Sequence, residues 1–210
     1  MTTFQRLALL GIAALLGGCA SSPMPPPARP ATDVAPGSRG PVQGVGIEGR
    51  DIVAMTNQMA RDLLNTPRVV GSGGQAPRVI IDGQYFKVEG SQPINRNVIT
   101  QRLMVELNRA SSGRLVFVGR RHSDMVAQER EAKREGTVDR ATNRMTKAQM
   151  GADYRLAGTF TTLDSMQSRT GMQQRYNQLV FELVDLESGE IVWSNLYEVE
   201  RAAADDVVYR

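Results

Sequence analysis

The chain has 210 residues, of which 41% are hydrophobic, enough for one compact domain and additional segments. Its 25 basic and 22 acidic residues leave a net charge of +3, a smaller excess than nucleic-acid-binding proteins usually carry. One cysteine and one histidine exclude an internal disulfide framework and a tetrahedral zinc site built from His and Cys. We therefore expect neither a metal nor a nucleic-acid partner.

The N-terminus has the pattern of a secretory signal peptide. A short cationic start precedes the apolar run 7–16, which is too short to cross a bilayer as a helix. The run ends in Leu-Gly-Gly-Cys at 16–19, which resembles the lipobox of bacterial lipoproteins. We therefore expect residues 1–18 to be removed and Cys19 to be lipidated.

The lipobox resemblance implies a membrane anchor. Acylation of Cys19 would add three acyl chains, and two or more chains hold a protein stably where one would exchange. Ala20 follows the cysteine, whereas Asp at this position favours retention in the inner membrane. The expected location is the periplasmic face of the outer membrane. The alternative is a free cysteine at the end of an ordinary cleavable signal.

Residues 19–46 differ in composition from the rest of the chain. Seven prolines lie among Ala, Ser and Gly, with almost no large apolar side chain. Such a segment cannot bury enough apolar surface to fold. Its prolines favour extended polyproline II, which would give a reach of about 80 Å. We predict a flexible, lipid-anchored tether that carries a globular domain at 47–210.

The globular part begins with alternating helical and strand patterns. Apolar residues recur at helical spacing over about 49–65 and again over 99–110, which predicts two helices. Short β-rich runs at 79–81 and 115–118 flank the second helix. This order predicts a β-α-β unit. A polar, helix-favouring stretch follows at 123–150 and is broken at Gly136.

Three longer strands are predicted in the C-terminal third, over 154–163, 175–186 and 190–201. The last two are joined by a hairpin loop that ends in Gly189. Residues 179–186 are apolar on both alternating faces, which favours a central strand partly covered on both sides. The predicted fold class is α+β, with a mainly antiparallel sheet of about four to five strands flanked by helices.

Five stretches of the globular part carry a resemblance to a known family, at 79–82, 99–107, 113–118, 151–156 and 183–193. Together they resemble the periplasmic lipoprotein activators of penicillin-binding proteins, the LpoB type. The resemblance implies a non-enzymatic outer-membrane protein that binds and stimulates a bifunctional peptidoglycan synthase. The last stretch also occurs in secretion-channel lipoproteins of related fold. The alternative is therefore an assembly or accessory lipoprotein of an outer-membrane secretion channel.

A basic stripe is the first predicted partner-binding group. Residues 120–147 carry eight basic residues against five acidic ones. At 100° per residue, Arg140, Arg144 and Lys147 fall within about 60° of one another. An acidic protein surface is the expected target, with anionic lipid or a teichoic-like polymer as alternatives. An ordinary solvated helix face is the other interpretation.

The second predicted group is Tyr85, Phe86 and Lys87, expected in an exposed loop after the first strand. An aromatic pair beside a cation is typical of protein-binding hot spots. The alternative is that the rings pack back onto the domain. By the family resemblance, Lys87 and Arg140 fall where those activators carry arginine, whereas Tyr85 and Phe86 replace small polar residues.

The sequence shows no catalytic constellation. His122 has no second His or Cys to complete a triad or a metal set, so we expect a surface histidine. The glycine run 71–74 lacks the Lys-Ser/Thr of a phosphate-binding loop. We therefore predict no enzymatic activity, no cofactor and no small-molecule substrate.

The lipobox hypothesis predicts that Cys19→Ser releases the protein from the membrane without unfolding the domain, because the anchor lies outside the predicted core. Membrane fractionation measures the release, and circular dichroism of the released protein checks the fold. A variant that still sediments with the outer membrane would show that something other than Cys19 holds the protein there.

Overall fold

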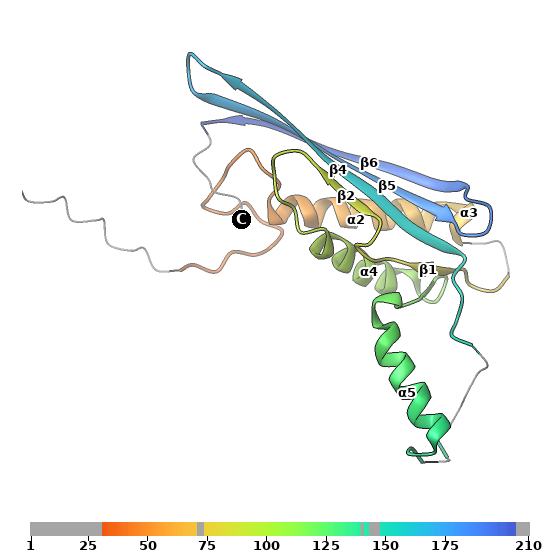
Figure 1. Ribbon diagram of the computed structural model, residues 1–210. Helices are drawn as coiled ribbons and strands as arrows, with labels where there is room; N and C mark the ends of the chain where they lie inside the picture. The colour runs from red at the N-terminus through yellow and green to blue at the C-terminus, as the bar shows by residue number, and fades with distance from the viewer. Residues whose placement is uncertain (1–30, 71–73, 140, 143–147, 205–210) are drawn as a thin grey trace, which may run out of the picture. The chain divides into compact units, whose positions relative to one another are not determined.

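The computed structural model describes residues 31–70, 74–139, 141–142 and 148–204 (Figure 1). The chain divides into two compact units, and residues 34–210 form the larger one. The predicted signal peptide, Cys19 and the first part of the predicted tether lie outside the described residues. Within the described part of the chain, no helix has the length and apolarity needed to cross a membrane.

The helices include the two that apolar spacing predicted and a third in the polar stretch after them. Their bounds are α2 Gly49–Asn65, α3 Pro67–Val70, α4 Arg96–Ser111, the 3-10 helix η1 Arg120–His122, and α5 Ser123–Glu135. At the start of α2, the Glu48 N–H donates to Asp51 Oδ2 over 2.9 Å, which satisfies a main-chain donor outside the helix. At the start of α4, Asn95 accepts from the main-chain N–H of Asn97.

The strands form one mixed sheet. Their bounds are β1 Arg78–Ile80, β2 Phe86–Glu89, β3 Val116–Phe117, β4 Tyr154–Gln167, β5 Met172–Asp185 and β6 Ile191–Ala203. The sheet order is β3-β1-β4-β5-β6, and β2 also pairs with β4. The long strands β4, β5 and β6 are antiparallel, whereas β1, β2 and β3 make parallel pairings. The α+β class and the β-α-β unit are confirmed, with β2 as an additional strand.

Strands β1 and β2 pair with the same edge of β4, one after the other along its length. Val79 of β1 pairs with Tyr154, and Phe86 of β2 pairs with Gly158 four residues further along β4. The five residues between β1 and β2 therefore form a loop that interrupts the pairing along this edge of β4. Because this pairing joins segments about 75 residues apart in sequence, local periodicity does not reveal it.

The hairpin of β4 and β5 is longer than predicted. Its ladder continues to the pair Gln167 and Met172, where Gly171 adopts φ +67° beside the turn. The side chains of 163–167 are all exposed, so this part of β4 lacks the apolar alternation from which the shorter strand was predicted.

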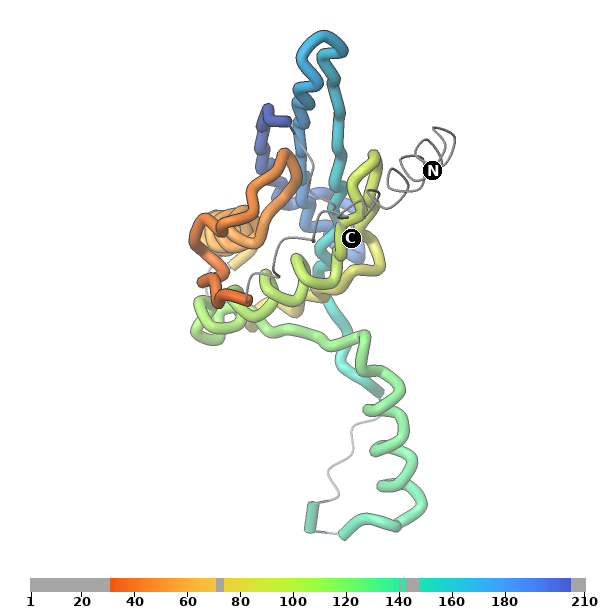
Figure 2. Tube along the Cα trace, turned by 90° about the vertical axis from the view of Figure 1, so that its left-hand side faces the viewer, coloured from red at the N-terminus to blue at the C-terminus, as the bar shows by residue number. Residues whose placement is uncertain are grey.

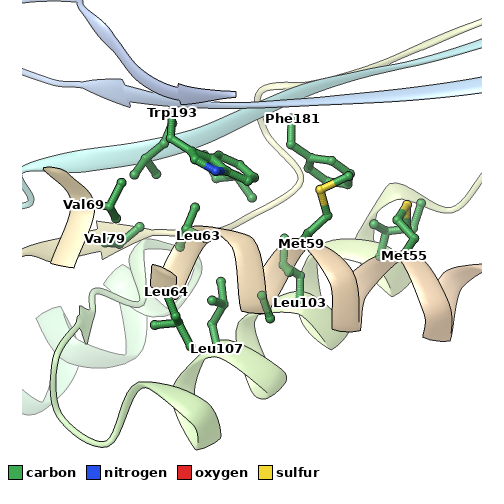
Figure 3. Packing of buried hydrophobic residues seen from close by; sticks show 14 of the residues in the cluster. Met55, Met59, Leu63, Leu64, Val69, Val79, Leu103, Leu107, Phe181 and Trp193 are labelled. Atoms are coloured by element: carbon green, nitrogen blue, oxygen red, sulfur yellow. The ribbon is translucent and has the colours of Figure 1, made fainter. Parts of the chain in front are cut away.

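The hydrophobic core lies between the sheet and helices α2 and α4. Figure 3 shows Met59 and Leu63 of α2 directed toward Phe181 and Trp193 of the sheet. Leu103 of α4 closes the other side of α2 and is also buried. The Trp193 Nε1–H donates to Asp62 Oδ2 of α2 over 2.7 Å, so the buried indole has a partner for its only donor.

The opposite face of the sheet is not covered by the helices, which lie on one side of β4, β5 and β6 (Figure 1). Leu179, Phe181 and Leu183 of β5 point toward α2 and are buried, whereas Val180 and Val184 are half-buried. β5 is central, as predicted. Among the described residues, the helices cover the face that carries Leu179, Phe181 and Leu183, whereas the alternate valines on the open face are half-buried.

The folded unit begins before residue 47. Val45 is fully buried, and its carbonyl accepts from the Asn177 amide over 3.5 Å. The Gly46 carbonyl accepts from Arg201 Nη1 over 2.7 Å. The predicted end of the tether at residue 46 is therefore too late. Polar side chains of β5 and β6 hold this segment, and local composition gives no sign of them.

Helix α5 extends away from the sheet (Figure 2). None of its residues is buried, and it ends at Gly136, which adopts φ +73°. The break predicted at this glycine is confirmed, since only a residue without Cβ takes this conformation at little cost.

An ion pair joins β1 to the start of β4. The Asp153 carboxylate accepts from the main-chain N–H of Arg78 over 2.8 Å, from its Nε over 3.1 Å and from its Nη2 over 2.5 Å. These hydrogen bonds from Arg78 hold the pKa of the Asp153 carboxyl below its usual range. The pair contributes to stability only while Asp153 is ionised.

We therefore expect the protein to lose stability in acid partly through Asp153. Because its pKa is lower in the folded chain, its contribution is complete above the unfolded value of about 3.9 and is lost as the pH falls through the folded value. Melting temperatures measured between pH 7 and pH 2.5 should fall less steeply for Asp153→Asn than for wild type. Glu187→Gln, in the exposed β5–β6 loop, is the control, and an unchanged acid slope in Asp153→Asn would contradict the prediction.

Candidate partner-binding site

The predicted group Tyr85–Lys87 lies at the start of β2, and its members face opposite ways. Tyr85 is 53% exposed, whereas Phe86 is only 6% exposed and belongs to the core. Lys87 is exposed on the same side as Tyr85. The expectation of an exposed loop was wrong for Phe86, because strand pairing with β4 turns every second side chain inward.

Phe86 occupies space that a glycine leaves open. A Cβ added to Gly158 of β4 would lie 2.6 Å from the Phe86 ring and 2.7 Å from the Val180 carbonyl oxygen. The Phe86 ring meets Phe181 edge-to-face, with centroids 5.5 Å apart. Phe86 is therefore the residue that holds β2 on the sheet, and the alternative that the ring packs back onto the domain is correct for it.

Tyr85 is fixed by an arginine that the sequence analysis missed. The Arg155 guanidinium carbon lies 4.4 Å from the Tyr85 ring centroid, a cation–π contact. Arg155 Nη2 also donates to Asp82 Oδ2 over 2.8 Å and to Gln84 Oε1 over 2.6 Å. A charged residue between Tyr154 and Leu156, in a strand that is otherwise apolar at this end, is the signal that could have identified it.

The cluster of Arg155, Asp82 and Gln84 holds the Tyr85 ring in one orientation before any partner binds. Arg155 and Asp82 are largely buried, with 18% and 12% of their side chains exposed, so their ion pair is shielded from water. Tyr85 stacks on this pair and still presents more than half of its surface. A rigid, partly exposed aromatic side chain loses little entropy on binding, which favours a protein-contact role.

Lys87 belongs to a row of side chains across the open face of the sheet. It pairs with Thr159 of β4, which pairs with Val180 of β5, which in turn pairs with Leu196 of β6. Leu196 is 40% exposed. We refer to Tyr85, Lys87, Val180 and Leu196 as the open-face surface.

Acidic side chains follow β6 beside this surface. Glu198 and Glu200 are exposed, and they accept from the Tyr176 hydroxyl over 2.5 Å and from Gln174 Nε2 over 2.7 Å. The hydrogen bond to Glu198 raises the pKa of the Tyr176 hydroxyl. The open face therefore has an aromatic and cationic side at β2 and an acidic side at β6.

The predicted basic stripe of Arg140, Arg144 and Lys147 lies outside the described residues. His122 is exposed, as predicted, and its Nε2 accepts from Arg121 Nε over 3.0 Å. Within the described ranges, no group of three His, Cys, Asp or Glu side chains is placed to bind a metal ion.

Comparison with known proteins gives one family. Residues 51–199 match the sequence model of the family described as peptidoglycan-synthase activator LpoB. No curated protein sequence matches the chain.

Solved structures are also similar to this chain, among them the following two. The LpoB C-terminal domain from Salmonella enterica is 19% identical over 70% of this chain and 96% of its own, with a TM-score of 0.37. Lipoprotein GNA1162 from Neisseria meningitidis is 14% identical over 62% of this chain and 87% of its own, with a TM-score of 0.32. The assignment to a family rests on the sequence match alone.

The opposite orientations of Tyr85 and Phe86 predict losses of stability of different size. Phe86→Ala should cost about 3 kcal/mol or more, because it empties a buried site against Phe181. Tyr85→Ala should cost about 1 kcal/mol or less, because an exposed ring and its cation–π contact are lost. Urea unfolding of both variants measures the difference, and equal losses would contradict this placement of β2.

Proposed function

The chain belongs to the LpoB family of peptidoglycan-synthase activators, and from this premise we propose that it binds a bifunctional penicillin-binding protein and stimulates its synthesis of peptidoglycan. The observation that carries the proposal is the family match over 51–199, which runs from α2 to β6. In this function the protein is a binding module and catalyses no reaction itself.

The proposed anchor is the lipidated Cys19 in the outer membrane. A lipobox at 16–19 and a proline-rich stretch after it support this arrangement. The tether then spans the distance from the membrane to the folded unit, so that the domain reaches a synthase on the other side of the peptidoglycan layer.

The proposed docking site is the open-face surface around Tyr85. Its support is the fixed Tyr85 ring, the exposed Lys87, and the apolar side chains of half-buried Val180 and exposed Leu196 in the same row. An aromatic anchor with apolar neighbours and a charged rim is the composition that protein interfaces favour. Phe86 supports the site from below rather than touching the partner.

The basic stripe of Arg140, Arg144 and Lys147 is proposed as a second contact. Its support is the excess of eight basic over five acidic residues between 120 and 147. Exposed charges contribute little to folding but steer and hold a complementary acidic surface. Binding through this stripe should weaken strongly as the salt concentration rises.

A reconstituted assay of glycan polymerisation and cross-linking tests the proposal. Wild-type protein should stimulate a purified bifunctional synthase from the same organism. Tyr85→Ala should require a several-fold higher concentration for the same stimulation, with little dependence on salt, because the lost contact is largely apolar. Joint reversal of Arg140, Arg144 and Lys147 to Glu should weaken stimulation most at low ionic strength.

The control is Arg61→Glu, an exposed change on α2 outside both proposed contacts. If the triple reversal stimulates at wild-type concentrations, the stripe is a solvated face. If Tyr85→Ala also does so, the open-face surface is not the docking site. If wild type stimulates no bifunctional synthase, the proposed function is wrong. Purification with an outer-membrane ring would then identify the secretion-channel alternative.

A further inference from the structure

A pocket lined mainly by polar residues lies just beyond the end of β1. It has a volume of about 360 Å³ and lies between the β1–β2 connection, the first turns of α4 and η1. Asp82 and Gln84 line it and also bind Arg155, which holds Tyr85. Two residues of the pocket lining therefore belong to the cluster that fixes Tyr85.

Three arginines line this pocket, and each binds a neutral acceptor. Arg96 Nη1 donates to the Phe86 carbonyl over 2.8 Å, and Arg120 Nη2 donates to the Met150 carbonyl over 2.7 Å. Arg121 Nε donates to His122 Nε2 over 3.0 Å. Each guanidinium carries five donors, so these bonds leave further N–H groups available.

The arginines lack a neutralising charge among the described residues. No described carboxylate forms an ion pair with Arg96, Arg120 or Arg121. Asp82 is the one carboxylate among the described lining residues, and Arg155 and the main-chain N–H of Gln84 already bind its two oxygens. The pocket therefore holds three positive charges against one carboxylate that is paired elsewhere.

We propose that this arginine pocket receives a carboxylate side chain of the synthase that docks on the open-face surface. The inference rests on the proposed function and names its recognition chemistry. A guanidinium offers a planar fork of donors that matches the two oxygens of a carboxylate. The adjoining Tyr85 would pack against the partner's surface beside that acidic residue, so one contact supplies apolar area and the other supplies charge complementarity.

Arg121 is the residue of choice for the test. It is exposed, and among the described residues its side chain hydrogen-bonds only to the neighbouring His122, whereas Arg96 and Arg120 bond to main-chain carbonyls of other segments. Arg121→Glu should therefore leave the melting temperature nearly unchanged. The matched control is Arg61→Glu, which makes the same charge change on α2 and does not line the pocket.

The experiment measures the dissociation constant of the complex between the full-length protein, in detergent, and a purified bifunctional penicillin-binding protein. Arg121→Glu should raise this constant at least tenfold at low salt, and the difference from wild type should shrink as salt is added. Arg61→Glu should leave it within twofold. Scanning single Asp or Glu residues of the synthase to Lys should identify one change that restores binding to Arg121→Glu and weakens binding to wild type.

Other results would separate a failure of the pocket inference from a failure of the proposed function. If wild type binds the synthase and Arg121→Glu binds equally well, the pocket inference is wrong while the proposed function stands. If wild type binds no bifunctional synthase, the proposed function fails, and the inference fails with it. Purified peptidoglycan sacculi, which also carry carboxylates, form a second arm. If Arg121→Glu loses binding to sacculi alone, the pocket serves peptidoglycan and the inference is overturned.

Discussion

The contact between Gly158 and Phe86 is the constraint on which the proposed site depends. With no Cβ at Gly158, the Phe86 ring lies against β4 and reaches Phe181 on β5. A buried aromatic side chain then holds a four-residue strand that is too short to be stable through its own hydrogen bonds. Because side chains alternate along a strand, this placement also fixes Tyr85 and Lys87 on the open face.

The two faces of the sheet have different roles. On one face, α2 and α4 bury the apolar side chains and supply the stability of the domain (Figure 3). On the other face, half-buried aliphatic side chains lie between an aromatic and cationic side and an acidic side. A surface that is rigid from below and unevenly charged above suits the recognition of one orientation of a partner.

The arginines of the described residues include some that bind carboxylates and some that bind neutral acceptors. Some are paired with carboxylates and join elements of the fold, as in Arg78–Asp153, Arg175–Asp164 and the two-fold contact of Arg201 with buried Asp51. Those around the pocket bind carbonyls or an imidazole instead. Pairing with neutral acceptors orients a guanidinium without neutralising it, so its charge remains available to a ligand.

Much of the architecture follows from the sequence alone, because it depends on local patterns. Apolar spacing determined α2 and α4, the glycine at 136 determined the end of α5, and alternation with a loop at 187–189 determined the final hairpin. The five stretches in the family resemblance likewise lie within the region of the family match.

Only the tertiary structure decided the rest. The parallel pairings of β1 and β2, the burial of Val45, and the meeting of Arg155 with Tyr85 each join segments that lie far apart in the chain. The inward turn of Phe86 depends on the space at Gly158, and the arginine pocket gathers side chains from three separate elements. Local periodicity records which face of an element is buried, but the free energy of these contacts comes from neighbours that the pattern does not identify.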